Sequence, residues 1–124
     1  MNRVILRESA FWGRSSVIIL AGGYGFVMVS VLDSARDVAV VHDIIVHESR
    51  RRKGIGNRLL KEAGDEAERL GADRIRLSVE PESWMADWYR RHGFMMTDVT
   101  ELDSHLCLVM ERRTRRDAPE PQIL

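Results

Sequence analysis

Positive charge lies directly against two glycines in the segment Glu48 to Leu60, which reads ESRRRKGIGNRLL. Four consecutive cations, residues 50–53, precede Gly54 and Gly56, and an amphipathic pattern follows them. The first N–H groups of a helix have no partner and carry partial positive charge, so a helix that begins here can bind an anion. Glycine lets the anion approach the backbone without a Cβ in the way. A solvated basic loop that simply starts a helix explains these residues equally well.

Two neighbouring polar residues form the second candidate for chemistry. His42 and Asp43 interrupt the apolar run from Val38 to Glu48, VAVVHDIIVHE. Such a break in a strand predicts a bulge or a strand end beside a functional site. No His/Cys cluster has the spacing of metal ligands, so we expect no metal.

The composition limits the class of protein. The 124 residues carry 19 Lys plus Arg and 19 Asp plus Glu, so no overall field attracts nucleic acid or a membrane, and any anion site must be local. The longest apolar run, residues 17–20, is far shorter than the ~20 residues that span a bilayer. The first seven residues lead into no signal-peptide core, and the single Cys107 suits a reducing compartment. We therefore expect a cytoplasmic protein that binds neither nucleic acid nor membrane.

The order of the predicted elements indicates one mixed sheet. Apolar runs and turn residues predict strands over 16–23, 25–33, 38–48, 74–80, 94–102 and 105–112, and helices over 54–70 and 83–93. The segment Val38 to Glu80 contains one β-α-β crossover, and the other connections are typical of antiparallel pairs. We expect an α/β (α+β) fold in one domain, residues 1–112, followed by a loose tail, residues 113–124. Trp84 and Trp88 are interpreted as core or interface aromatics.

The region from Val38 to Phe94 resembles the central part of the GNAT superfamily, the acetyl-CoA-dependent N-acetyltransferases. In that superfamily an apolar strand precedes the pattern R/Q-x-x-G-x-G/A and a long helix, and a further strand and a short helix follow. The matching residues here are Val46, Arg51, Gly54, Gly56, Ala86, Tyr89, Gly93 and Phe94. The combination is far more specific than any of its parts, and it implies a GNAT-like, mostly antiparallel sheet with splayed strands.

The resemblance implies acetyl-CoA as the cosubstrate. The pyrophosphate of coenzyme A would lie on the N–H groups of residues 52–56, and the pantetheine arm would pair with the edge of the preceding strand, where that strand splays from residues 74–80. The implied cofactor-binding residues are Ile44, Ile45, Val46, Arg51, Arg52, Lys53, Gly54, Ile55, Gly56, Ser83 and Tyr89. The family often carries Asn at the position of Ser83, and the shorter serine either reaches the pantetheine or caps the helix.

The implied reaction is direct transfer of acetyl from the thioester to a primary amine of a small molecule or protein. Tyr89 matches the family's general acid, and packing as a helical aromatic is the alternative interpretation. His42 is the first candidate for the base and Asp43 the second, while bonding of both to the backbone is equally compatible with the pattern. Strand alternation places these two side chains on opposite faces, so we expect at most one to face the acceptor. A bulge N–H near residues 44–46 would stabilise the oxyanion.

The front of the chain departs from the family pattern. Family members usually have a first strand and two helices before the first hairpin, whereas residues 1–15 suffice for one short strand or helical turn. The acceptor pocket is then either open or completed by another copy of the chain. An exposed apolar edge of this kind favours a homodimer. A catalytically degenerate acyl-CoA-binding module is the alternative function, and a nucleic-acid binder that uses residues 50–53 is a third.

Overall fold

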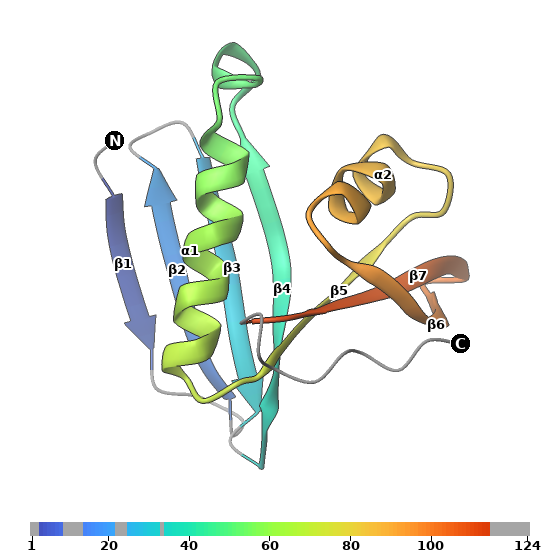
Figure 1. Ribbon diagram of the computed structural model, residues 1–124, viewed down its shortest axis with the longest axis horizontal. Helices are drawn as coiled ribbons and strands as arrows, with labels where there is room; N and C mark the ends of the chain where they lie inside the picture. The colour runs from blue at the N-terminus through green and yellow to red at the C-terminus, as the bar shows by residue number, and fades with distance from the viewer. Residues whose placement is uncertain (1–2, 9–13, 22–24, 33, 115–124) are drawn as a thin grey trace.

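β-branched and other apolar residues fill the first part of the chain, and they form four consecutive antiparallel strands in the computed structural model (Figure 1). The structure describes residues 3–8, 14–21, 25–32 and 34–114. Its elements are β1 (Arg3–Glu8), β2 (Arg14–Ala21), β3 (Gly25–Leu32), β4 (Ala35–Val46), the 3-10 turn η2 (Glu48–Arg50), α1 (Ile55–Arg69), β5 (Arg74–Val79), α2 (Trp84–Arg91), β6 (Met95–Leu102) and β7 (His105–Arg113).

The described strands form one sheet in the order β1-β2-β3-β4-β5-β7-β6. Within it, β4 and β5 pair in parallel and are connected through α1, and every other neighbouring pair is antiparallel. This arrangement confirms the predicted mixed, mostly antiparallel sheet with one β-α-β crossover. No helix among the described residues is long and apolar enough to cross a membrane.

The parallel pair is short, and the two strands then separate. Residues Val38–Val40 of β4 pair with Arg74–Arg76 of β5, but β4 continues to Val46 while the rest of β5 pairs only with β7. Figure 1 shows β5, β7 and β6 turning away from β4, with α1 over one part of the sheet and α2 beside the other. The predicted splay is therefore present, and it leaves the β5-facing edge of β4 without a strand partner beyond Val40 among the described residues.

A bulge interrupts β4 where the sequence pattern breaks. Val29 of β3 pairs with Val41, but the preceding residue, Met28, pairs with Asp43, so His42 is an extra residue on β4. This register confirms the expected irregularity at the His-Asp dipeptide. After the bulge, Ile44 lies opposite the buried Val27.

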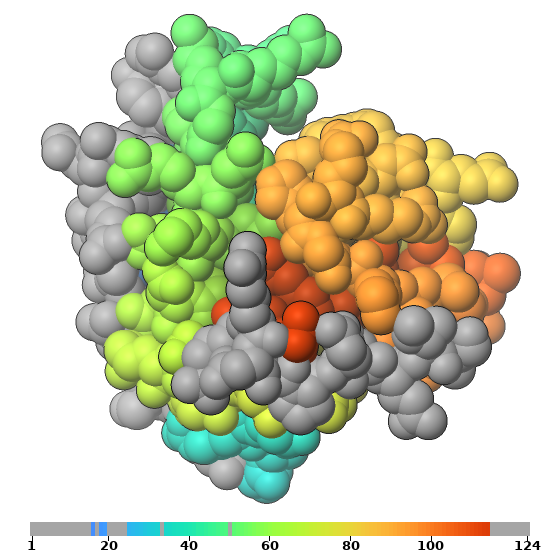
Figure 2. All heavy atoms as spheres, viewed as in Figure 1, coloured from blue at the N-terminus to red at the C-terminus, as the bar shows by residue number. Residues whose placement is uncertain are grey.

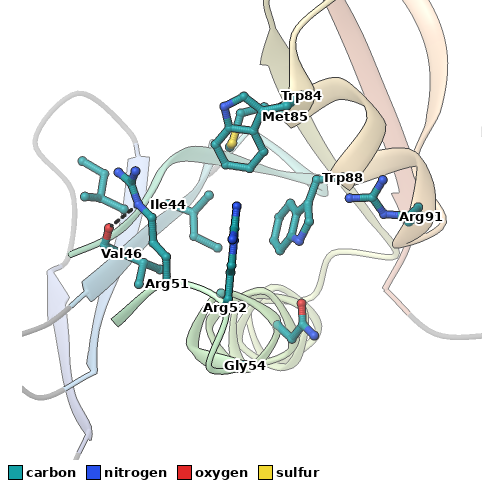
Figure 3. Close-up of a pocket in the computed structure, with 12 residues that line it drawn as sticks. Ile44, Val46, Arg51, Arg52, Gly54, Trp84, Met85, Trp88 and Arg91 are labelled. Carbon is teal, nitrogen blue, oxygen red and sulfur yellow. Dashed lines mark hydrogen bonds between the residues drawn. The ribbon is translucent and has the colours of Figure 1, made fainter. Parts of the chain in front are cut away.

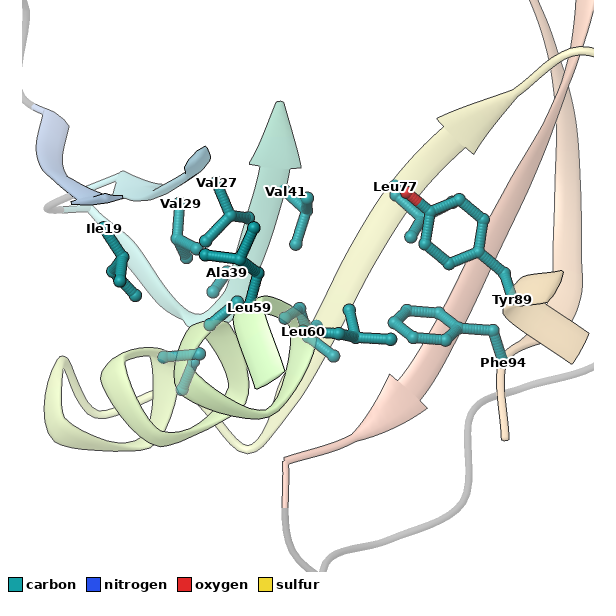
Figure 4. Packing of buried hydrophobic residues seen from close by; sticks show 14 of the residues in the cluster. Ile19, Val27, Val29, Ala39, Val41, Leu59, Leu60, Leu77, Tyr89 and Phe94 are labelled. Atoms are coloured by element: carbon teal, nitrogen blue, oxygen red, sulfur yellow. The ribbon is translucent and has the colours of Figure 1, made fainter. Parts of the chain in front are cut away.

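The apolar stripe of α1 packs on the face of the sheet that carries the odd-numbered residues of β3. Leu59, Leu60 and Ala63 of the helix are fully buried against Val27 and Val29 of that strand (Figure 4). The helix ends at Arg69, and Gly71, which has φ +96°, turns the chain away two residues later: the N–H groups of residues 71 and 72 bond the carbonyls of residues 68 and 67. The core continues through Leu60 to Phe94 on the far side of the splay, so one core joins both halves.

Several predicted boundaries shift by a few residues. The strand predicted from Val38, β4, begins at Ala35. Of the two possibilities for the first residues, a short strand or a helical turn, residues 3–8 form the strand. The turn of that hairpin, residues 22–24, lies outside the described residues. The folded part extends past residue 112, because β7 reaches Arg113 and the Thr114 N–H bonds the carbonyl of Asp73 at 2.9 Å. The rest of the expected tail, residues 115–124, also lies outside the described residues.

Candidate functional site

A cavity of about 870 Å³ opens where β4 separates from β5. The end of β4, the loop before α1 and one side of α2 enclose it (Figure 3), and Figure 2 shows the surface hollowed between that loop and α2. Its lining residues are Ile44, Ile45, Val46, Arg51, Arg52, Gly54, Gly56, Asn57, Trp84, Met85, Trp88 and Arg91.

The N-terminus of α1 faces this cavity without a cap. Gly54 adopts the left-handed conformation with φ +80°, its residue type offers no side-chain cap, and no acidic residue lies in the first turn. The first hydrogen bond of the helix runs from the N–H of Arg58 to the carbonyl of Gly54 at 3.1 Å, so the intervening N–H groups have no intrahelical acceptor. A Cβ on Gly56 would lie 3.4 Å from the Trp88 ring. Backbone donors thus meet the cavity with little side-chain cover.

One face of α2 forms the opposite wall. Trp84, Trp88 and Arg91 recur at intervals of four and three residues, so they lie on the same side of the helix, and Trp84 is 66% exposed. Ser83 begins this helix: its hydroxyl accepts the Ala86 N–H at 3.2 Å and donates to the carbonyl of Glu80 at 2.9 Å. Ser83 is therefore the helix cap, and it does not line the cavity.

His92 ties the end of α2 to the first turn of α1. Its Nε2 lies 2.9 Å from Oδ1 of Asn57, and its Nδ1 lies 2.8 Å from the carbonyl oxygen of Trp88. The imidazole also packs against the Trp88 ring, with 4.4 Å between the ring centroids and 43° between the ring planes. Because Asn57 and Trp88 both line the cavity, these contacts fix the distance between its two walls.

The charge on the cavity wall has one sign. Arg51, Arg52 and Arg91 contribute guanidinium groups, and none of the described lining residues is acidic. Arg51 is partly positioned by a hydrogen bond from its Nε to the carbonyl of Val46 at 3.2 Å. A polyanion is the ligand class that this wall favours.

Tyr89 lies behind the cavity wall, within the core. It is 5% exposed, it packs edge-on against Phe94 with 5.4 Å between ring centroids, and Figure 4 shows its hydroxyl directed toward Leu77 of β5. Burial raises the pKa of Tyr89 to about 12, and the negative charge of Asp43 adds to the increase. The phenol therefore stays protonated at neutral pH. Tyr89 packs as a core aromatic and also lies close enough to the β4 bulge for the charge of Asp43 to affect its pKa.

His42 and Asp43 lie on the same face of the sheet, which corrects the expectation from strand alternation. The His42 imidazole is hydrogen-bonded through Nε2 to the hydroxyl of Ser30, and Asp43 pairs with Met28, two residues from Ser30 on the same strand. The bulge is the physical reason, because an extra residue brings two successive side chains to one side. Both side chains are exposed on the face away from α1. The bulge precedes residues 44–46, where the oxyanion donor was expected.

Seven predicted residues line the cavity together, and six do not. The seven are Ile44, Ile45, Val46, Arg51, Arg52, Gly54 and Gly56, and the six are His42, Asp43, Lys53, Ile55, Ser83 and Tyr89. Sequence reasoning missed Asn57, Trp84, Met85, Trp88 and Arg91. The spacing of Trp84, Trp88 and Arg91 was the available signal. Of the two interpretations of Trp84, core or interface aromatic, its exposure contradicts the core placement, and the interface placement stays a prediction.

Comparisons with known proteins agree with this geometry. The sequence model of the acetyltransferase (GNAT) domain matches residues 8–96. A GNAT family acetyltransferase from Elizabethkingia anophelis with acetyl-CoA bound is similar with a TM-score of 0.70 and 14% identity, over 90% of this chain and 98% of that chain. Nourseothricin acetyltransferase is similar with a TM-score of 0.67 and 26% identity, over 84% of this chain and 67% of that chain.

The fold likeness extends further. A Bacillus subtilis acetyltransferase in complex with CoA has a TM-score of 0.64 and 20% identity, over 80% of this chain and 76% of that chain. No curated protein matches the sequence. At these identities the Elizabethkingia and Bacillus structures bear on the fold alone, and the family match covers most of the chain.

The raised pKa of Tyr89 gives a direct test of its environment. The sequence contains two tyrosines, so a Tyr24→Phe variant leaves Tyr89 as the only phenol. We expect its ultraviolet phenolate absorbance to appear around pH 12, two units above the ordinary value of 10.0. Because the folded pKa is raised, its contribution to stability, roughly 2–3 kcal/mol, is fully present below pH 10 and is lost as the pH rises toward 12.

The matching control is Tyr89→Phe, which removes this titration and this loss of stability. A phenol that ionises near pH 10 in the folded Tyr24→Phe protein would contradict the buried placement of Tyr89. Far-ultraviolet circular dichroism at each pH reports whether the protein is still folded.

Proposed function

The chain belongs to the GNAT acetyltransferase family, and on that basis we propose that it transfers an acetyl group from acetyl-CoA to a primary amine of a small molecule or protein, directly in a ternary complex. The observation that carries the proposal is a single cavity in which the unpaired edge of β4 meets the uncapped N-terminus of α1. Acetyl-CoA or CoA is bound in two of the structural neighbours.

The residues present fit acetyl-CoA. Its diphosphate needs backbone donors and cations, which the first turn of α1 and the arginines Arg51 and Arg52 supply. Its pantetheine arm carries amide groups, which need a β-edge such as Ile44–Val46. The absence of acidic side chains among the described lining residues removes repulsion of the phosphates. Lys53, which is exposed beside the loop, would add attraction from outside the cavity.

Bound acetyl-CoA would supply an activated acetyl thioester. An alkylamine is mostly protonated at neutral pH, since its pKa is about 10, and the ammonium form has no lone pair. We assign removal of this first proton to His42 or Asp43, which both lie on the open face beside the β4 bulge. The backbone N–H groups of β4 beyond the bulge would donate to the carbonyl oxygen as it becomes negative.

The last step requires a proton at sulfur. As the new C–N bond forms and the C–S bond breaks, the nitrogen releases a second proton, and the sulfur must gain one. Tyr89 is the candidate donor, because it stays protonated and its ring lies between the wall residue Trp88 and the core residue Phe94. The pKa of about 12 exceeds the ~8.5 of a thiol, so Tyr89 acts mainly by donating a hydrogen bond, and the proton from nitrogen replaces any that it gives up.

One observation favours the alternative, a catalytically degenerate acyl-CoA-binding module. Tyr89 does not line the cavity and is a weaker acid than an ordinary phenol, as expected for a residue retained for packing. A binder of this kind would keep the anion site and the β-edge while producing no free thiol. Binding and turnover must therefore be measured separately.

Binding of the diphosphate is tested by Gly56→Val. Because a Cβ at residue 56 already lies 3.4 Å from the Trp88 ring, two further methyl groups fill the space in front of the helix N-terminus. We expect calorimetry at low ionic strength to show at least a tenfold weaker affinity for CoA, which corresponds to about 1.4 kcal/mol. Gly71→Ala, which strains a left-handed residue at the other end of α1, is the control and keeps wild-type affinity.

Turnover distinguishes the enzyme from the binding module. We expect release of free thiol from acetyl-CoA in the presence of at least one amine in a panel of small molecules and peptide N-termini. Loss of the Tyr89 hydroxyl in Tyr89→Phe should lower kcat roughly 10- to 100-fold with little change in KM. Wild-type protein that binds CoA but acetylates no amine would favour the degenerate module, and equal kcat in the variant would remove Tyr89 from the mechanism.

We also propose a homodimer located in the cytoplasm. Support for self-association comes from the hairpin at the sheet edge, where Val99, Leu102 and Leu106 are 45%, 51% and 63% exposed. A second copy that covers this edge would bury them. Sedimentation at micromolar concentration should give a mass of two chains for the wild type and of one chain for Leu106→Asp. A monomeric wild-type protein would refute the proposal.

A further inference from the structure

The cavity arginines come from two separate places. Arg51 and Arg52 belong to the loop before α1, whereas Arg91 is at the end of α2, on the other side of Trp88 in Figure 3. The proposed diphosphate site uses the loop, so it leaves the third cation without a task. A guanidinium on the far wall is placed to bind a second negative group of a ligand in the cavity.

Arg91 has no partner for its charge among the residues that the structure describes. Within the described residues its side chain forms no ion pair or hydrogen bond, whereas its neighbour Arg90 donates to Asp87 at 2.8 Å. Figure 3 shows the Arg91 guanidinium directed toward Trp88 and the cavity. The two successive arginines thus differ: one is paired on the outer surface of α2, and the other lines the cavity.

The position of Arg91 relative to the helix N-terminus follows from the contacts of the next residue. His92 lies 2.9 Å from the side chain of Asn57, which is in the first turn of α1, three residues after Gly54. Adjacent Cα atoms are about 3.8 Å apart, so Arg91 enters the cavity beside that same turn. Its long side chain can therefore bind a group that one ribose separates from a diphosphate on the α1 N-terminus.

We propose that Arg91 forms a second phosphate subsite, which binds a phosphomonoester on the ribose of the cosubstrate. This inference rests on the proposed function, since the cosubstrate of that reaction, coenzyme A, carries a 3′-phosphate that dephospho-coenzyme A lacks. A guanidinium binds phosphate oxygens through two parallel hydrogen bonds, and a phosphomonoester carries nearly two negative charges at neutral pH. The subsite makes the chain selective for the complete cofactor over its precursor.

Calorimetry with the two ligands tests the subsite. The wild-type chain, Arg91→Gln and Arg90→Gln are each titrated with CoA and with dephospho-CoA at low ionic strength. We expect the wild type to bind CoA roughly tenfold more tightly than dephospho-CoA, as for one charge-assisted contact at an exposed site. Arg91→Gln should lose most of this preference while its affinity for dephospho-CoA changes less than twofold. Arg90→Gln should keep the wild-type preference.

The outcomes separate this inference from the proposed function. Equal wild-type affinity for the two ligands, or a loss in Arg91→Gln that is equal for both, would overturn the subsite and leave the acetyl-CoA proposal intact. The same loss of preference in Arg90→Gln would reduce the effect to general surface charge. Failure of the wild type to bind either ligand would overturn both proposals. Thermal unfolding of each variant verifies that these exposed substitutions leave the fold unchanged.

Discussion

The separation of β4 from β5 is the constraint on which the rest of the structure depends. Three residue pairs, Val38–Val40 with Arg74–Arg76, join the two strands, and β4 then runs six residues further with β3 as its strand partner but without β5. Backbone N–H and C=O groups on that edge need partners other than a neighbouring strand. An extended ligand with amide groups can provide them. The separation of the two strands, which removes hydrogen bonds from the sheet, thus creates the proposed site for the pantetheine arm.

Buried contacts hold the two diverging halves at a fixed separation. Arg112 of β7 donates to the carbonyl of His92 at 2.9 Å, lies over the Phe94 ring at 5.2 Å, and reaches α1, where a Cβ on Gly64 would be 3.2 Å from its guanidinium. Burial lowers the pKa of this arginine. His92 continues the connection to Asn57. Side chains from β7 and α2 that contact α1 therefore hold the two walls of the cavity in place.

The sequence predicted what local pattern determines. The glycine loop, the stripe of α1, the Ser83 cap and the break at His42 each gave the right element, since turn, cap and periodicity act within a few residues. The seven predicted lining residues of the loop and of β4 were implied by the resemblance of residues 38–94 to the GNAT superfamily, and the local pattern alone indicated only an anion site at the glycine loop. The wall formed by α2 could not be predicted, because the helical spacing of the aromatic residues is the same whether their side chains are buried or, like Trp84, exposed. Which way α2 faces depends on contacts with distant parts of the chain, such as those of His92 with Asn57 and Arg112.

The prediction that His42 and Asp43 lie on opposite faces of the sheet was wrong for a similar reason. Alternation assumes one residue per pleat, and the extra residue in β4 brings Asp43 to the side of Ser30. The high pKa of Tyr89 also arises from tertiary packing, since burial is its main cause. Local sequence thus located the anion site, whereas the arrangement of the groups that would move protons depends on contacts between elements distant along the chain.

Amide hydrogen exchange with and without CoA tests the central claim most directly, because it observes the backbone groups that the account assigns to the ligand. Saturating CoA should slow exchange at Ile44–Val46 and at Gly54–Asn57, while the amides of β2, on the other side of β3, exchange as before. Unchanged exchange at both segments under conditions where CoA is bound, or protection confined to other elements, would contradict the account.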